Sequence, residues 1–243
     1  MFKNLQRRLY PEKIPEDIIA IILLIFSSLS LYFLVHFILP EKENVIDNGS
    51  FLFFRPFISP VFTEIAKIVT FLGTGTFLVP SYLLIIMYLT RNNFTKLALM
   101  TSTIAVSSLL LGWLLKNIFH RMRPQHHLVS GAGGYSFPSG HALGGFIFTG
   151  VLIYLVWQTR KSFYIKWIFT FIAFALATLI GVSRIYLHVH YATDVLGSLF
   201  IALSWLSFMY ILFRLVYQHE LHGRSGNEES NIDYFPSDYY LDN

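Results

Sequence analysis

The stretch 191–213, YATDVLGSLFIALSWLSFMYILF, decides the class of this protein. It is long and apolar enough to cross a membrane as one helix, which needs about 20 mostly apolar residues. Its one charged residue is Asp194. An ionisable side chain inside a span is costly and by default indicates a functional site with a partner nearby. His190, four residues earlier, falls on the same helical face, so the stretch predicts a His–Asp pair at the membrane.

The rest of the chain has the composition of a membrane protein. Of its 243 residues, 54% are hydrophobic, 17% aromatic and only 13% charged, whereas a soluble domain carries roughly 25% charged residues. We expect an all-α, polytopic membrane protein with six transmembrane helices, at roughly 17–39, 61–90, 95–117, 139–158, 163–183 and 191–216. In the second segment, Gly-Thr-Gly at 73–75 predicts an interfacial helix over 61–72 and a span over 75–90. The absence of cysteine excludes disulfides and thiolate chemistry.

Charge divides the chain into two parts. Residues 1–217 are expected to form the six-span domain, and they hold 17 basic and 8 acidic residues, a formal charge of +9. This excess suits anionic lipid headgroups and an anionic substrate. Residues 218–243 hold six acidic residues against one basic residue, Arg224, and are expected to form a flexible tail.

The basic residues also predict the orientation in the membrane. Six spans put both termini on one face, and cytoplasmic termini place 11 basic residues inside and six outside. This bias is the one that the positive-inside rule favours. We therefore expect a protein of the inner (cytoplasmic) membrane with both termini in the cytoplasm and an extracytoplasmic active site.

Three basic residues lie near the outer ends of the predicted spans. Lys116 ends the third span and Arg123 follows seven residues later, so the two share a face if the helix continues. Arg184 ends the fifth span, and its planar guanidinium fork suits phosphate oxygens. A single cation at a span end is commonly an interfacial anchor. Three cations at one mouth could instead hold a phosphoryl group and its transition-state charge.

The segment Phe137-Pro138-Ser139-Gly140-His141 opens the fourth span. Proline followed by serine at a helix start is an ordinary capping pattern. The same geometry leaves the backbone N–H groups of the first turn unpaired, and with the helix dipole they form an anion site. Ser139 adds a hydroxyl donor, Gly140 allows a close approach, and His141 could reach the leaving oxygen of a bound phosphate.

These motifs together resemble the signature of the type 2 phosphatidic acid phosphatase family. They read Lys116-x6-Arg123-Pro124, Pro138-Ser139-Gly140-His141 and Ser183-Arg184-x5-His190-x3-Asp194, in the order and spacing of that family. Beside them stand His188 and Ala192, where relatives often carry glycine and proline. The resemblance implies a lipid phosphatase that hydrolyses a lipid-linked phosphomonoester or pyrophosphate. The compact six-span body looks like bacterial members that act on undecaprenyl pyrophosphate or on glycerophospholipid phosphates.

The resemblance also implies a role for each matched residue. His190 would attack phosphorus to form a phosphohistidine, Asp194 would orient it, and His141 would protonate the leaving group and then activate water. The phosphoryl oxygens would be bound by Lys116, Arg123, Ser139, Gly140 and Arg184. No cofactor, metal or nucleic acid is expected, and the expected partners are the lipid phosphate or pyrophosphate substrate and membrane lipids.

Three alternatives compete with a phosphatase. A zinc site at His188, His190 and Asp194 is disfavoured because metal-dependent phosphatases need several carboxylates. An intramembrane serine protease built on Ser139 and His190 would need an oxyanion hole rather than three cations. A lipid-phosphate-binding or transport protein without hydrolysis would explain the cations but not the pairing of two histidines with Asp194.

Overall fold

The computed structural model describes residues 16–40 and 45–225, and the regular elements in these ranges are helical. In chain order they are α2 (Glu16–Phe33), the π-helix η1 (Leu34–Ile38), α3 (Val45–Phe54), the 3-10 helix η2 (Arg55–Phe57), α4 (Pro60–Phe71), α5 (Gly75–Arg91), α6 (Thr95–Phe119), α7 (Gly140–Trp157), α8 (Phe163–Tyr186) and α9 (Ala192–Ser225).

Six segments of the described residues are long and apolar enough to cross a membrane. They are Asp17–Ile38, Pro60–Arg91, Thr95–Phe119, Gly140–Trp157, Phe163–Tyr186 and Ala192–Val216. Their outer faces carry large apolar side chains that no protein atoms cover, such as Phe171 (76% exposed) and Val106 (70% exposed). A lipid bilayer is the solvent that such faces require. The predicted all-α, six-span fold is confirmed.

The break predicted in the second segment is also present. Ser59 caps α4, since its side chain accepts a hydrogen bond from Phe62 N, and Pro60 occupies the first turn. Thr74 caps α5 in the same way, accepting from Phe77 N. Two separately capped helices therefore replace one continuous span.

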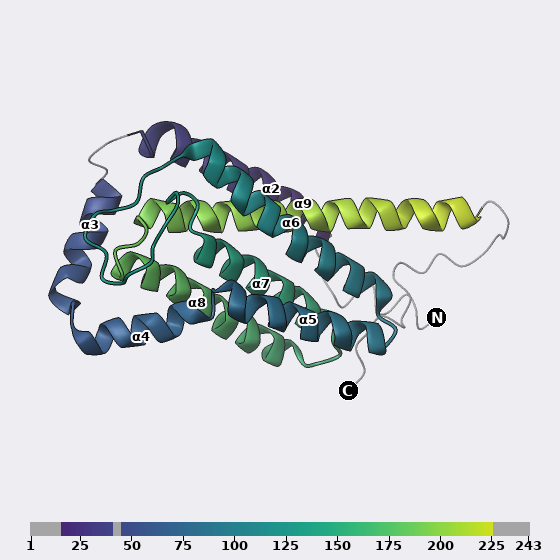
Figure 1. Ribbon diagram of the computed structural model, residues 1–243. Helices are drawn as coiled ribbons and strands as arrows, with labels where there is room; N and C mark the ends of the chain where they lie inside the picture. Colours follow the sequence, from purple (N-terminus) through teal and green to yellow (C-terminus); the bar gives the residue numbers. More distant parts are fainter. Residues whose placement is uncertain (1–15, 41–44, 226–243) are drawn as a thin grey trace.

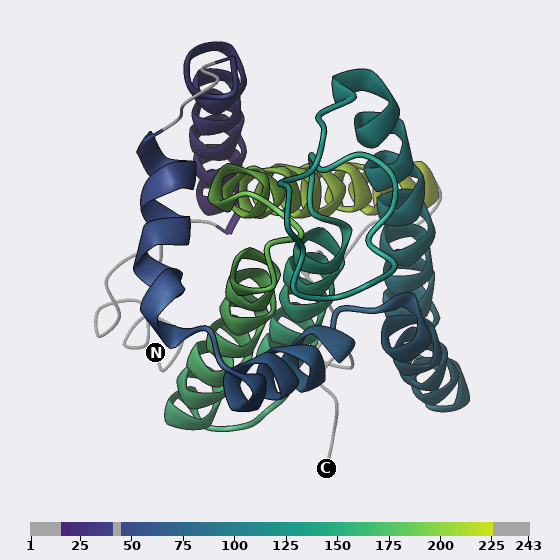
Figure 2. The ribbon, with the colours of Figure 1, turned by 60° about the vertical axis from the view of Figure 1, so that its left-hand side comes forward.

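The long helices run side by side, and the α6–α7 and α8–α9 connections lie at one end of this bundle (Figure 1). α2 packs against α9, α7 packs against α8 and α9, and α5 packs against α6. The C-terminal ends of α6 and α8 and the N-terminal ends of α7 and α9 lie at this end of the bundle, and α3 lies across it. When this end is turned forward, α3 and the loop between α6 and α7 lie on its near side (Figure 2). The predicted site residues fall in these segments.

Two features differ from the expected layout or extend beyond it. α3 has no counterpart among the predicted segments. α9 continues to Ser225, so the helix includes the first residues of the segment 218–243 that was expected to be flexible. Residues 226–243 lie outside the described residues, and the expected flexible tail stays a prediction for them.

Candidate active site

All eight predicted site residues come to the same end of the bundle. Lys116 lies in the last turn of α6, Arg184 in the last turn of α8, and Asp194 in the first turn of α9. Ser139 is the N-cap residue of α7, which begins Gly140-His141. Arg123 and His190 lie in the α6–α7 and α8–α9 connections. The topology therefore assembles the site from four helix ends and two loops.

Lys116 and Arg123 reach the site by different routes. α6 ends at Phe119, and His120 follows with a left-handed backbone (φ 47°) that closes the helix. The helix does not continue to Arg123, so Lys116 and Arg123 do not share a helical face. Arg123 instead approaches from the loop, where its Nε donates to Gly133 O and Gly134 O at 3.2 and 3.1 Å.

His190 and Asp194 form the predicted pair, although His190 precedes the helix. Nδ1 of His190 lies 3.3 Å from Oδ2 of Asp194, and both side chains are buried. Nε2 of His190 lies 3.1 Å from Nη1 of Arg123. A guanidinium can only donate, so Nε2 is the acceptor and Nδ1 carries the proton. The lone pair of the imidazole therefore faces Arg123, as a nucleophile directed at an anion would require.

Arg123 joins the nucleophile to the neighbouring backbone. Its Nη1 donates to Val189 O at 2.7 Å as well as to His190. Burial lowers the pKa of Arg123, and the negative charge of Asp194 opposes that shift. The side chain is therefore a cation held beside the lone pair of His190 in a partly desolvated site, where its field is stronger than in water.

The N-terminus of α7 holds a buried hydroxyl that has no hydrogen-bond partner among the described residues. Ser139 is fully buried at the N-cap position, yet its Oγ accepts no capping hydrogen bond and has no other partner in the described part of the chain. A buried polar group left unpaired is costly. The adjoining Gly140 leaves room: a Cβ there would lie 3.9 Å from Cε of Lys116. The N-terminus of α7 therefore faces Lys116 with no side chain between them, and the hydroxyl of Ser139 beside it is available to donate.

Arg184 is the second buried group with an unpaired atom. Its Nη1 donates to Thr70 Oγ1 of α4 at 3.0 Å, whereas its Nε has no partner among the described residues. Lys116 donates to Tyr135 O at 2.6 Å. The cations that act electrostatically on His141 are Arg184, Arg123 and Lys116. His141 therefore faces the same cluster of positive charge as His190.

Two charged residues that carry no role in the sequence motifs complete the site. Arg121 Nη1 donates to Asp194 Oδ1 at 2.6 Å, and its Nη2 donates to Asp47 Oδ2 at 2.8 Å. Ser136 Oγ also donates to Asp194 Oδ2. Neither Arg121 nor Asp47 belongs to the sequence motifs: Arg121 is one of the six basic residues expected outside, and Asp47 lies between the first two predicted spans.

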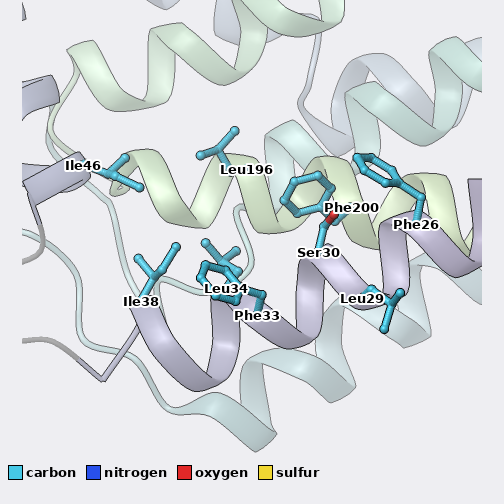
Figure 3. Close-up of a pocket in the computed structure, with 9 residues that line it drawn as sticks. All are labelled: Phe26, Leu29, Ser30, Phe33, Leu34, Ile38, Ile46, Leu196 and Phe200. Atoms are coloured by element: carbon cyan, nitrogen blue, oxygen red, sulfur yellow. The ribbon is translucent and has the colours of Figure 1, made fainter.

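An apolar groove lies beside the site, not in it. It is lined by α2, η1, α3 and α9 and has a volume of about 480 Å³ (Figure 3). Its one polar lining residue is Ser30, and the rest are aliphatic or aromatic. It has no cation that could hold a phosphate. Within the described residues, no three His, Asp or Glu side chains converge as a metal site.

Comparison with known proteins identifies the family. The model of the PAP2 superfamily matches residues 95–217, which include all eight predicted site residues. Two curated relatives come from Bacillus subtilis (strain 168). Phosphatidylglycerophosphatase B is 30% identical over 167 residues, covering 65% of this chain and 76% of the relative. Undecaprenyl-diphosphatase BcrC is 32% identical over 113 residues, covering 44% and 53%.

Two solved structures share the fold. One is the crystal structure of a transmembrane PAP2-type phosphatidylglycerolphosphate phosphatase from Bacillus subtilis. It has 24% identity and a TM-score of 0.67, covering 81% of this chain and 96% of that one. Aquifex aeolicus LpxE has 23% identity and a TM-score of 0.53, covering 70% and 97%. The family model and the 30% identical relative show that the chain belongs to the PAP2 superfamily and is a membrane phosphatase.

Proposed function

We propose that this chain hydrolyses a lipid-linked phosphomonoester or pyrophosphate through a phosphohistidine on His190, without a metal. The proposal is carried by two buried donors at the site, Ser139 Oγ and Arg184 Nε, that have no partner within residues 16–40 and 45–225. They border a cluster that also holds Lys116, Arg123 and the lone pair of His190. Donors of this kind are what a phosphoryl group would satisfy, because phosphoryl transfer depends mainly on positioning and charge stabilisation.

The first step forms the phosphoenzyme. Nε2 of His190 attacks phosphorus, and the bond from phosphorus to the leaving oxygen breaks. The negative charge of the bound phosphate offsets the cations around His141 and favours its protonated form. That imidazolium gives its proton to the leaving oxygen, so the leaving group departs as a lipid alcohol or a lipid monophosphate. Asp194 accepts the Nδ1 proton in a hydrogen bond and stabilises the positive charge that develops on the ring. Lys116, Arg123 and Arg184 offset the negative charge of the phosphoryl oxygens.

The second step regenerates the enzyme. His141, now neutral, takes a proton from a water molecule as its oxygen attacks phosphorus. The N–P bond breaks, its electron pair returns to Nε2 of His190, and inorganic phosphate leaves. Each histidine ends in its starting protonation state.

The relatives favour two substrate classes. One curated relative is named a phosphatidylglycerophosphatase and the other an undecaprenyl-diphosphatase, so we favour a glycerophospholipid phosphate or undecaprenyl pyrophosphate. Both present a phosphate on a lipid anchor to a site at the end of the spans. With cytoplasmic termini, the site would act in the outer leaflet of the inner membrane.

Phosphate release by the purified chain in detergent tests this function. The panel contains phosphatidylglycerol phosphate, phosphatidic acid and undecaprenyl pyrophosphate, with p-nitrophenyl phosphate as a water-soluble control, each with and without excess EDTA. We expect release from at least one lipid, faster than from the control and unchanged by EDTA. Binding of these lipids with no release would favour a binding or transport protein. Loss in EDTA that one divalent cation restores would favour a metal enzyme.

A further inference from the structure

Arg121 lies between two buried carboxylates that come from opposite parts of the chain. Its side chain is 17% exposed, whereas those of Asp47 and Asp194 are 4% and 0% exposed. The guanidinium donates one hydrogen bond to each carboxylate, at 2.6 Å to Asp194 and 2.8 Å to Asp47. Its face also lies over the ring of Tyr191, 4.2 Å from the centroid. This environment fixes the orientation of Arg121 on several sides.

Asp47 in turn attaches α3 to the start of α9. Its Oδ1 accepts hydrogen bonds from Thr193 N at 2.9 Å and from Thr193 Oγ1 at 3.0 Å. Thr193 Oγ1 also accepts from Arg121 Nη1 at 2.7 Å. A carboxylate that receives a backbone N–H in the first turn of a helix also complements the helix dipole. α3 therefore contributes a charge that holds both Arg121 and the turn next to Asp194.

The hydrogen bonds of Asp194 divide between its two oxygens. Oδ2 receives Ser136 Oγ, Tyr191 N at 2.9 Å and Nδ1 of His190 at 3.3 Å. Oδ1 receives Arg121. The carboxylate thus cannot rotate toward His190 or away from it without losing the Arg121 bond. Without Arg121, the two buried carboxylates would lose their shared cation, and such unpaired charges are strongly disfavoured.

We propose that Arg121, held by Asp47 of α3, is a positioning residue that keeps Asp194 ionised and turned toward His190. This rests on the proposed function, because it assigns Asp194 the task of orienting a nucleophilic His190. Arg121 donates its hydrogen bonds to Asp47, Asp194 and Thr193, so we do not assign it to phosphate binding. Its loss should slow the chemical step and leave phosphate binding intact.

The test compares kcat, KM and the inhibition constant of inorganic phosphate in purified variants. Arg121→Gln should lower kcat by about 100-fold, the cost of a misplaced catalytic group, with the phosphate inhibition constant within about threefold of wild type. Arg184→Gln should do the reverse, raising KM and the phosphate inhibition constant. Lys67→Gln is the matched control, because it breaks an exposed ion pair with Glu64 on α4 and should change neither.

A milder variant covers the case in which Arg121→Gln does not fold. Asp47→Asn keeps an oxygen that can accept from Thr193 N, and it replaces Oδ2, which accepts from Arg121 Nη2, by an amide group that can only donate. It should fold and lower kcat by about tenfold, again without weakening phosphate inhibition. Wild-type kcat in Asp47→Asn, or in a folded Arg121→Gln, overturns the proposal. So does an equal loss of phosphate binding, which would make Arg121 a phosphate ligand.

The two proposals fail in different ways. An inactive wild type on every lipid would refute the proposed function, while the ratio of each variant to wild type tests the positioning role. If the wild type is inactive, the tautomer of His190 still tests that role, read from the ¹⁵N shifts of the imidazole. Wild type should carry its proton on Nδ1, and Arg121→Gln should show a mixture of tautomers. An unchanged tautomer would refute the positioning role.

Discussion

At the scale of single residues, the surroundings of His190 set the pH range in which its imidazole is neutral. Its pKa is lowered to about 4, mainly by burial; Asp194 opposes this shift, and the charges of Arg123 and Arg184 add to it. A neutral imidazole keeps the lone pair that the proposed mechanism requires, so we expect His190 to keep it as pH falls until the ring is protonated near 4. An unfolded chain would protonate it near 6.5. Acidification from about 6.5 to 4 therefore favours unfolding.

A titration of the His190 imidazole by NMR checks this shift. The purified protein with ¹⁵N-labelled histidine should show a midpoint near 4, with the signal assigned by its absence in His190→Gln. Asp194→Asn should move the midpoint lower still, because Asp194 raises the pKa of His190. A wild-type midpoint near 6.5 would mean that His190 is solvated and free of these charges.

The same scale shows which site residues a sequence can reveal. Ser139 and His190 lie in motifs whose local spacing carries the chemistry, so they could be predicted. Arg121 and Asp47 interact across 74 positions of sequence separation, and no spacing rule links them. Their pairing depends on where α3 lies, which hydrophobic periodicity alone does not determine.

At the scale of elements, the corner between α4 and α5 positions His141. A Cβ added to Gly73 would lie 2.9 Å from His141 O and 2.7 Å from Ile180 Cγ2, closer than side chains approach. Gly73→Ala must therefore displace the start of α7 or a core side chain, at a cost of about 1–3 kcal/mol. We expect kcat to fall by about tenfold or more in a phosphate-release assay, because small displacements of catalytic groups are costly.

Gly75→Ala is the matched control for that corner. It lies two residues away, and a Cβ there would meet nothing within 4 Å. We expect this variant to keep wild-type kcat. Equal activity of the two variants would show that the added Cβ is accommodated without moving His141, and that the α4–α5 corner does not position it.

Element boundaries were predicted where composition marks them clearly. Gly-Thr-Gly at 73–75 and the Pro138-Ser139 pair predicted helix starts that the structure has. α3 was missed because Val45–Phe54 is short and contains Asp47, Asn48 and Gly49, so it does not resemble a span. The end of α6 at Phe119 was not marked by glycine or proline, since His120 takes the left-handed conformation that glycine usually supplies.

At the scale of the whole molecule, the site residues at one end of the bundle make sidedness testable. Single cysteines at Asn48, Gln125 and Ser225 suit this cysteine-free chain. Asn48 and Gln125 are exposed near the site, and Ser225 ends α9. With cytoplasmic termini, a membrane-impermeant thiol reagent on intact cells should label the first two and not the third. Labelling of all three after permeabilisation is the control.

The reverse labelling pattern would change the side of the membrane to which the site is assigned. It would place the site in the cytoplasm and rule out a role in recycling lipid carriers on the outer leaflet. The charge bias supports the first pattern, because three of the six basic residues placed outside are assigned to phosphate rather than to topology.

The phosphoenzyme itself offers the most direct measurement. Purified enzyme is mixed with ³²P-labelled lipid phosphate, quenched rapidly without acid, and the labelled residue is located by peptide mapping. We predict label on His190 in wild type and in His127→Ala, an exposed histidine of the α6–α7 loop. His190→Ala should show no label and no turnover while folding normally. Turnover without label on His190, or His190→Ala activity within about tenfold of wild type, about 1.4 kcal/mol of barrier, would contradict the phosphohistidine mechanism.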